Sequence, residues 1–237
     1  MFFAYQGRPL SIDGVAEACK CYVAKATREN DGNKEPLSAA SLRNRIRYLT
    51  AACRYAWKKH NLCQDDPAAR VIVPTVKNER QQYASRAEMI KIVRACCNWN
   101  SRRAFRIAFY SGMRLSEILK YVIRGGNFVL AETKNGEPRI VPIHRKIGSA
   151  VARFDQNTAK ITIQRAFTRT VRQIGLSHLH FHDLRHSAAS ALINAGVDLY
   201  TVGRVLGHKD SRSTQRYAHL AVDTLTIAIN KIGKRVP

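Results

Sequence analysis

The sequence predicts a mainly α-helical protein with one small antiparallel β-sheet. One segment, residues 38–62, carries apolar side chains at the three- and four-residue spacing of an amphipathic helix, and residues 182–196 and 198–207 are two further predicted helices. Residues 127–143 instead alternate on either side of Asn135-Gly136, a dipeptide typical of β-hairpins. With 237 residues the chain is long enough for one large domain or two ordinary ones.

Charge is the strongest compositional signal. The formal net charge is +23, with 14 basic and 8 acidic residues in 1–80 against 26 and 9 in 81–237. A field of this sign and size attracts polyanions, so nucleic acid is the expected partner. A solvated basic surface or a ribosomal-type protein remains an alternative, because charge alone identifies no site.

Cysteine usage and hydropathy point to a cytoplasmic protein. The six cysteines show no C-x-x-C spacing, which predicts reduced thiols in a reducing compartment. Gln6 and Arg8 interrupt the apolar start of the chain where a signal peptide needs a continuous apolar run. No stretch approaches eighteen apolar residues, so we expect no membrane span.

The first predicted helix, within residues 38–62, has a basic edge. Its apolar positions include Leu42, Ile46 and Cys53, and a basic stripe lies on a neighbouring face. A solvated stripe and a phosphate-binding stripe are about equally expected for this helix alone, and the net charge favours DNA contact. The stripe consists of Arg43, Arg47, Arg54 and Lys58.

A domain boundary is expected near residue 80. Pro67 and Pro74 break the periodicity of residues 65–83, which we interpret as a linker. Ser85 and Glu88 then form a capping-box pattern that opens a new helix. The predicted domains are residues 1–80 and 81–237.

The second part places single charged residues on turns. A helix over residues 102–110 ends at Ser111-Gly112, so Arg114 lies on a turn before a short helix, and Lys134 lies at the tip of the hairpin. Residues 121–125 are a candidate third strand. Further helices over 182–196 and 198–207 end at glycines, and a last helix runs from about Asp223 to Lys231.

Three kinds of chemistry could use the histidines and arginines of residues 178–219. A metal site is disfavoured, because His182 and His186 lack an obvious third ligand and Arg185 between them would repel a cation. A helix-turn-helix over 188–207 is a weak match, since its second helix shows few base-reading side chains.

The third chemistry is metal-free phosphoryl transfer through Tyr217. A phenol with a pKa of about 10 is a poor nucleophile, so it needs groups that stabilise the charge developing on the phosphate. Arg114 and Arg185 could stabilise that charge, because one guanidinium group can donate two parallel hydrogen bonds to two phosphate oxygens. Lys134, with His182 or His208, could move protons to the departing sugar oxygen.

Five motifs in this order resemble the tyrosine recombinases, the phage integrase family. They are "YSGMRLSEILKY" around Arg114, "TKNGEPRIVPI" around Lys134, H-x-x-R at His182 to Arg185, "LGH" at 206–208, and Tyr217 nine residues later. The resemblance extends from about residue 40 to 225. Each motif alone is weak, and their joint order is specific.

The resemblance implies a role for each matching residue. Tyr217 would be the nucleophile, Arg114 and Arg185 the phosphate clamp, and Lys134 the general acid to the 5′ oxygen. His182 would aid proton transfer from the tyrosine, and His208 would donate a hydrogen bond to the phosphate. Glu117 matches a supporting acidic position, and no cofactor or metal is implied.

The family fold implied is a helical core-binding domain and an integrase-type catalytic domain that close on duplex DNA as a C-shaped clamp. Partners implied are a second protomer on each site, a tetramer in synapsis and accessory DNA-bending proteins, near the nucleoid of a bacterium and encoded by it or by a phage. The C-terminal helix, with Ile227, Ile229 and Ile232, could dock on a neighbouring protomer or pack on its own core.

Two departures and two alternatives accompany the resemblance. The short N-terminal part predicts no extra arm-binding domain, and the segment between "EILKY" and "NFVLAE" is compressed. A type IB topoisomerase would share nearly all these residues, and a non-catalytic DNA-binding protein could keep the scaffold. Packing or capping is expected for His178, His180, His186 and His219, and amphipathic packing for the other tyrosines.

Overall fold

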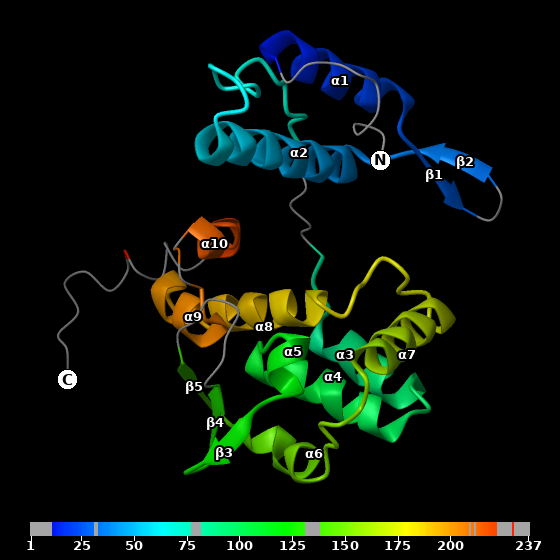
Figure 1. The fold of residues 1–237 in the computed structure, drawn as a ribbon. Helices are drawn as coiled ribbons and strands as arrows, with labels where there is room; N and C mark the ends of the chain where they lie inside the picture. The colour runs from blue at the N-terminus through cyan, green and yellow to red at the C-terminus, as the bar shows by residue number, and fades with distance from the viewer. Residues whose placement is uncertain are drawn as a thin grey trace. The chain divides into compact units, whose positions relative to one another are not determined.

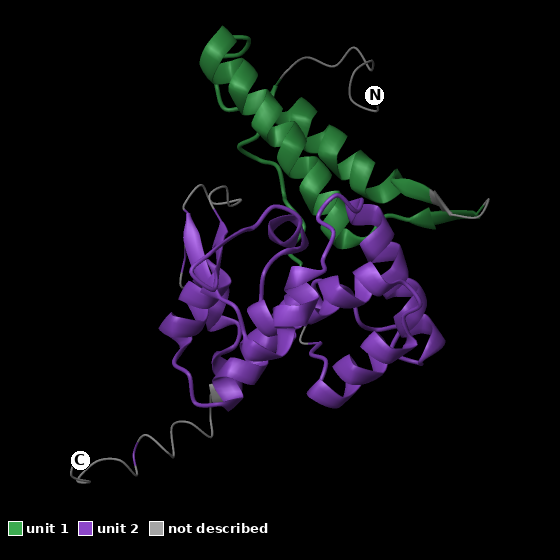
Figure 2. Cartoon of the chain, turned by 90° about the horizontal axis from the view of Figure 1, so that it is seen from below, with its two compact units in different colours: residues 1–79 green, residues 80–237 purple. Residues whose placement is uncertain are grey.

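The chain divides into two compact units, residues 1–79 and 80–237, which are described separately (Figure 2). The computed structural model describes residues 11–30, 33–76, 82–130, 138–208, 210, 212–221 and 229. Its described part is mainly helical with small antiparallel sheets, which confirms the predicted fold class. None of the helices in these ranges is both long and apolar enough to cross a membrane.

The described part of unit 1 forms two helices and a two-stranded sheet (Figure 1). The elements are α1 (Ile12–Lys25), β1 (Thr27–Asn30), β2 (Asn33–Pro36) and α2 (Ala39–His60). Ser11 and Ser38 cap the two helices through their side chains, as expected for serine at an N-cap. Buried Val15 and Cys19 of α1 pack with Ile46 and Cys53 of α2.

The sequence predicted α2 but not the β1–β2 sheet. Both strands are almost wholly polar, "TREN" and "NKEP", so no apolar alternation marks them. They pair antiparallel with Thr27 opposite Pro36, and an Arg28–Glu35 ion pair of 2.7 Å crosses the sheet.

The linker prediction for residues 65–83 is wrong at both of its ends. Ala68 is only 3% exposed, and Val71 and Val73 pack on the unit 1 core. At the other end, Tyr83 packs on a core cluster of unit 2. The two prolines interrupt the apolar pattern, so the sequence did not reveal the positions that pack on the core. Residues 77–81 lie outside the described part.

Unit 2 is built around a buried central helix, α4 (Trp99–Ser111). Phe105 of this helix is fully buried and meets Phe167 and Phe181 edge to face. The predicted capping box of Ser85 and Glu88 is confirmed at the start of α3. The helices besides α4 are α3 (Arg86–Ala95), α5 (Leu115–Ile118), α6 (Gly148–Ala152), α7 (Lys160–Gln173), α8 (Asp183–Asn194), α9 (Leu199–Leu206) and α10 (Arg212–Gln215), with 3₁₀ turns η1 (Arg145–Ile147) and η2 (Ala218–Ala221).

A three-stranded antiparallel sheet lies on one side of unit 2, in the order β3 (Val122–Arg124), β4 (Asn127–Leu130) and β5 (Arg139–Pro142). Phe128 of β4 lies opposite Val141 of β5, and both side chains are buried. The predicted hairpin strands and the third strand are therefore confirmed. The predicted tip with Lys134 lies outside the described residues.

The glycine stops are confirmed where the helices end. Gly112 caps α4 and Gly207 caps α9, both with positive φ (64° and 66°), and Gly196 follows α8 with φ 83°. The expected last helix over 223–231 lies outside the described residues except for Ile229.

Candidate active site

A close approach between two turns positions Arg114. A Cβ atom on Gly112 would lie 2.7 Å from Cδ2 of Leu206, so only glycine lets the α4–α5 turn pack this tightly on the end of α9. Arg114 follows as the N-cap of α5, with its side chain 19% exposed. The packing of the α4–α5 turn against the end of α9 therefore presents this guanidinium at the surface of unit 2.

Glu117 is a buried carboxylate that holds two arginines. It accepts from Arg114 Nη1 at 2.7 Å, from the Arg114 backbone N–H at 2.7 Å and from Arg139 Nη2 at 2.6 Å. Burial raises its pKa, but the Arg139 charge and the bonds from Arg114 outweigh burial and lower the pKa overall. Glu117 is therefore ionised and fixes both guanidinium groups.

Arg185 on α8 is buried, with 3% exposure, and is the most enclosed arginine that the structure describes. It donates from Nη1 to the Gly112 carbonyl at 2.7 Å and from Nη2 to the Leu206 carbonyl at 2.6 Å. Burial, together with the charges of Arg114 and Arg139, lowers the pKa of Arg185 to about 9. The group still carries its charge at neutral pH.

Three arginines converge on the last carbonyls of α9. Arg139, Arg185 and Arg114 donate to the carbonyls of Val205, Leu206 and Gly207, respectively, the last at 3.5 Å. Carbonyls at a helix C-terminus lack intrahelical donors and carry partial negative charge. This helix end therefore holds together cations that would otherwise repel one another.

His208 follows the Gly207 turn and lies beside the arginines. Its Nδ1 is 2.8 Å from the hydroxyl of Thr214, which is buried. Burial and then the charges of Arg185 and Arg114 lower the pKa of His208 to about 4, so the ring is neutral at neutral pH. If the threonine hydroxyl donates to Nδ1, the ring carries its proton on Nε2 and can donate from there.

Tyr217 is buried, with 1% exposure, between α10 and η2. It packs in a cluster with Ala189 and Leu206, and its hydroxyl lies 2.5 Å from Nδ1 of His186. Burial raises the tyrosine pKa, and the Arg216 and Arg185 charges only partly oppose the rise. At neutral pH the phenol is therefore protonated.

His182 precedes α8 and is exposed, with its ring edge-on to that of His186 at 5.0 Å between centroids. Partial enclosure of the ring and the Arg185 charge lower the pKa of His182. Arg114, His182, Arg185, His208 and Tyr217, five of the six predicted catalytic residues, thus lie in one region of unit 2. Lys134 lies outside the described residues.

The predicted DNA-contact residues belong to α2 of unit 1. Arg47 and Lys58 are exposed, Arg43 is half-buried, and Arg54 pairs with Asp66 at 2.9 Å. The stripe is thus present on the helix surface, and part of the Arg54 charge is already neutralised by an ion pair.

Sequence reasoning missed two residues of the site. Arg139 is half-enclosed by Glu117 and the Val205 carbonyl, which are distant in sequence, so no local pattern marks it. We expected packing or capping for His186, whereas in the structure its Nδ1 lies 2.5 Å from the Tyr217 hydroxyl. Its position four residues after His182, on the same helical face, was the available signal.

The arrangement suits an anion with several oxygens. Three guanidinium groups converge on the end of α9, two of them bound to one carboxylate, and the neutral His208 and Tyr217 belong to the same region. Such cations stabilise charge on phosphate oxygens during attack by a nucleophile. Within the described ranges, no group of three His, Cys, Asp or Glu side chains could hold a metal ion.

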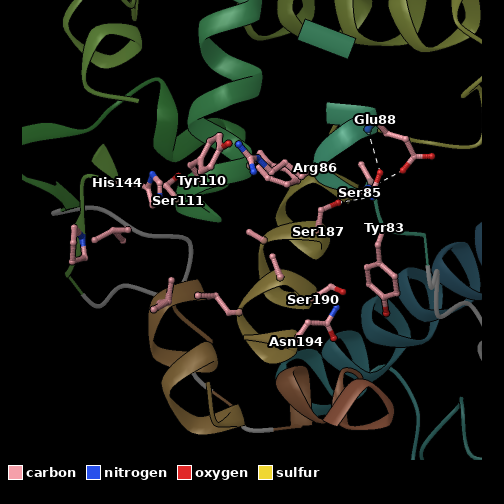
Figure 3. Close-up of a pocket in the computed structure, with 18 residues that line it drawn as sticks. Tyr83, Ser85, Arg86, Glu88, Tyr110, Ser111, His144, Ser187, Ser190 and Asn194 are labelled. Carbon is pink, nitrogen blue, oxygen red and sulfur yellow. Dashed lines mark hydrogen bonds between the residues drawn. The ribbon is translucent and has the colours of Figure 1, made fainter. Parts of the chain in front are cut away.

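A pocket of about 700 Å³ lies on another face of α8 (Figure 3). Ser187, Ser190 and Asn194 of that helix face Tyr83 and Ser85 across it, and the Ala84 backbone N–H donates to Ser187 at 2.7 Å. None of the predicted catalytic residues that the structure describes lines this pocket. The cation cluster is thus a separate feature of unit 2.

Fold and site together define the class of the tyrosine recombinase catalytic domains. A lambda integrase (residues 75–356) dimer bound to a COC′ core site matches with a TM-score of 0.66 and 18% identity, over 85% of this chain and 80% of that one. At this identity the match establishes the fold.

The chain belongs to the phage integrase family, whose model matches residues 82–223. Tyrosine recombinase XerA of Saccharolobus solfataricus is 28% identical over 194 residues, covering 76% of this chain and 65% of that protein. Tyrosine recombinase XerC of Xanthomonas campestris pv. campestris (strain B100) is 30% identical over 220 residues, covering 79% and 66%. The chain thus spans about two thirds of the length of these two relatives.

Proposed function

We propose that this chain is a site-specific DNA recombinase that cuts and rejoins strands through a 3′-phosphotyrosyl intermediate at Tyr217. The observation that carries the proposal is the buried Tyr217, whose hydroxyl lies in the field of Arg185, one of three arginines that converge on the end of α9. Family membership and the relatives named XerA and XerC support it.

The chemistry proceeds by two transesterifications. The Tyr217 oxygen bonds to a backbone phosphorus as the bond to the 5′ oxygen breaks, and a 5′ hydroxyl of the partner strand later reverses the attack. Arg114 and Arg185 neutralise the phosphate oxygens in both steps. His208 donates a hydrogen bond to the phosphate, Lys134 protonates the leaving 5′ oxygen, and His182 assists proton transfer. The phosphotyrosyl bond conserves the energy of the cut linkage.

Duplex DNA is the proposed substrate and partner. The net charge of +23 and the exposed basic positions of α2, Arg47 and Lys58 among them, fit phosphate contacts. We propose that residues 1–80 bind the core site and residues 81–237 catalyse the reaction. A dimer on each site and a tetramer in synapsis complete the proposal, in the compartment that holds the genomic DNA.

A nicked suicide duplex tests this function, because the small fragment released after cleavage cannot religate. We expect a covalent protein–DNA adduct that resists denaturation and is absent in Tyr217→Phe. Tyr200→Phe is the matched control, since Tyr200 is 75% exposed and lies outside the site. Absence of an adduct with every duplex, with DNA binding retained, would favour the non-catalytic alternative.

The topoisomerase alternative needs a separate readout. A type IB enzyme would relax supercoiled plasmid as a monomer, whereas a recombinase joins strands from two duplexes. Mapping the cleaved phosphate on genomic or phage DNA and then supplying two copies of that site distinguishes them. Relaxation without any recombinant product would overturn the proposed strand exchange.

A further inference from the structure

Within the described part of the chain, the contact between His186 and Tyr217 is the shortest link from the proposed nucleophile to another titratable group. The Tyr217 hydroxyl lies 2.5 Å from His186 Nδ1, and both residues are buried. His182, the residue that motif spacing singled out, instead contacts the His186 ring edge-on. The histidine one turn along α8 thus occupies the position nearest to the hydroxyl.

The direction of this hydrogen bond follows from the other partners of the hydroxyl. Among the described residues, the Tyr217 hydroxyl has no acceptor besides His186 Nδ1. If the buried O–H did not donate to Nδ1, its proton would have no hydrogen-bond acceptor, which costs about 1–3 kcal/mol. The hydroxyl therefore donates to Nδ1, and the neutral His186 carries its own proton on Nε2.

We propose that His186 accepts the proton of Tyr217 as the phenol oxygen attacks the DNA phosphate. This inference rests on the proposed function and assigns to His186 a role in it. The oxygen–phosphorus bond forms while the phosphorus–5′ oxygen bond breaks. The phenol proton passes to His186 Nδ1, and the 5′ oxygen takes a proton from the general acid, for which Lys134 is proposed. In the rejoining step both protons return.

The surroundings of His186 make this transfer depend on bound DNA. Burial and the groups that face the ring, first Arg216 and then His182, Arg185 and His208, lower its pKa to about 3. With these charges alone around the ring, proton transfer from the phenol is therefore strongly unfavourable. A phosphate bound at the arginines adds negative charge beside the ring, which raises its affinity for a proton.

Single-turnover adduct formation on the nicked duplex tests the proposal. His186→Asn keeps an acceptor oxygen near the Nδ1 position but cannot hold a proton. We expect its cleavage rate to fall at least about 100-fold between pH 6 and 8, with duplex affinity unchanged within about twofold. His180→Asn is the matched control, because His180 is exposed near the start of α8, and we expect the wild-type rate.

A duplex with a bridging 5′ sulfur separates the two proton transfers, because a thiolate departs without a general acid. The His186→Asn defect should persist on this substrate, whereas a Lys134→Ala defect should disappear. A His186→Asn rate within about threefold of wild type, or its rescue by the sulfur substrate, would overturn the proposal.

A measurement on the wild-type protein covers the case in which His186→Asn fails to fold. Nitrogen-15 NMR should show His186 with Nδ1 unprotonated, and Tyr217→Phe should shift that signal. A proton on Nδ1 would contradict the assignment. This readout needs neither DNA nor activity, so its outcome is independent of the adduct assay that tests the function itself.

Discussion

Glu117→Gln tests whether the buried carboxylate holds the arginine cluster together. The substitution keeps the shape of the side chain and one acceptor oxygen but removes the charge that Arg114 and Arg139 share at 2.7 and 2.6 Å. The side chains are 19% and 10% exposed for the arginines and 3% for the glutamate, so water cannot replace the lost partner. We expect the free energy of unfolding of unit 2 to fall by about 3–5 kcal/mol.

Urea unfolding followed by circular dichroism measures the loss, and hydrogen exchange of the α4 amides identifies the unit 2 transition. Glu35→Gln is the control, because it breaks the Arg28–Glu35 pair of 2.7 Å whose side chains are 58% and 45% exposed. That exposed pair should contribute at most about 1 kcal/mol. Equal effects of the two substitutions would refute the reasoning.

Acid supplies a second check on Glu117. Its folded pKa lies below the usual value, so its stabilisation is complete above the unfolded pKa of about 4.3 and is lost as the pH falls through the folded pKa. The difference between wild type and Glu117→Gln should therefore shrink in that acid window. A difference that grew with acid would contradict the assigned charge state.

Three further perturbations follow from the same site. Arg185→Ala should lower the rate of adduct formation at least about 100-fold and leave most duplex binding, measured by gel shift, intact. Equal losses of cleavage rate and of binding would argue against a phosphate clamp by Arg114 and Arg185. Gly207→Ala should destabilise unit 2 more than Gly196→Ala, because both have positive φ but only a Cβ at 207 would meet Arg139, at 2.7 Å; equal thermal shifts would contradict this. His186 and His208 have folded pKa values of about 3 and about 4, so below about pH 6.5 the unfolded chain binds more protons than the folded one. The free energy of unfolding should therefore fall with acid by up to about 1.4 kcal/mol per pH unit for each histidine. Denaturation from pH 7 to 5 measures this slope, and His186→Asn should reduce it.

Local patterns predicted the parts of the fold that local rules control. The capping box at Ser85, the glycine stops at 112 and 207, and the strand pairing on either side of the hairpin all follow from short-range backbone preferences. The polar β1–β2 sheet and the packed segment around Val71 were missed. Their apolar contacts are too few or too interrupted to produce a periodic signal.

In the site, too, local motifs predicted some residues and long-range contacts determine others. Motif order identified Arg114, His182, Arg185, His208 and Tyr217, which the fold brings into one region. Arg139 and His186 depend on contacts across 66 and 31 positions of the chain, which no spacing rule encodes. Their roles become visible only when each polar atom near the cluster is assigned a partner.

The excess of cations over carboxylates links the resting site to its proposed reaction. Glu117 pairs with Arg114 and Arg139, while Arg185 is held by backbone carbonyls, so the three guanidinium groups carry more positive charge than this one carboxylate neutralises. The α9 carbonyls hold the guanidinium groups in place as dipoles and do not neutralise them. Burial, then the charge of Arg216, and to a smaller extent that of Arg185, lower the pKa of His186, which disfavours removal of the Tyr217 proton until an anion arrives. A phosphate that enters the cluster would relieve the repulsion and strengthen the base in one step, which ties activation of the nucleophile to the presence of the DNA backbone.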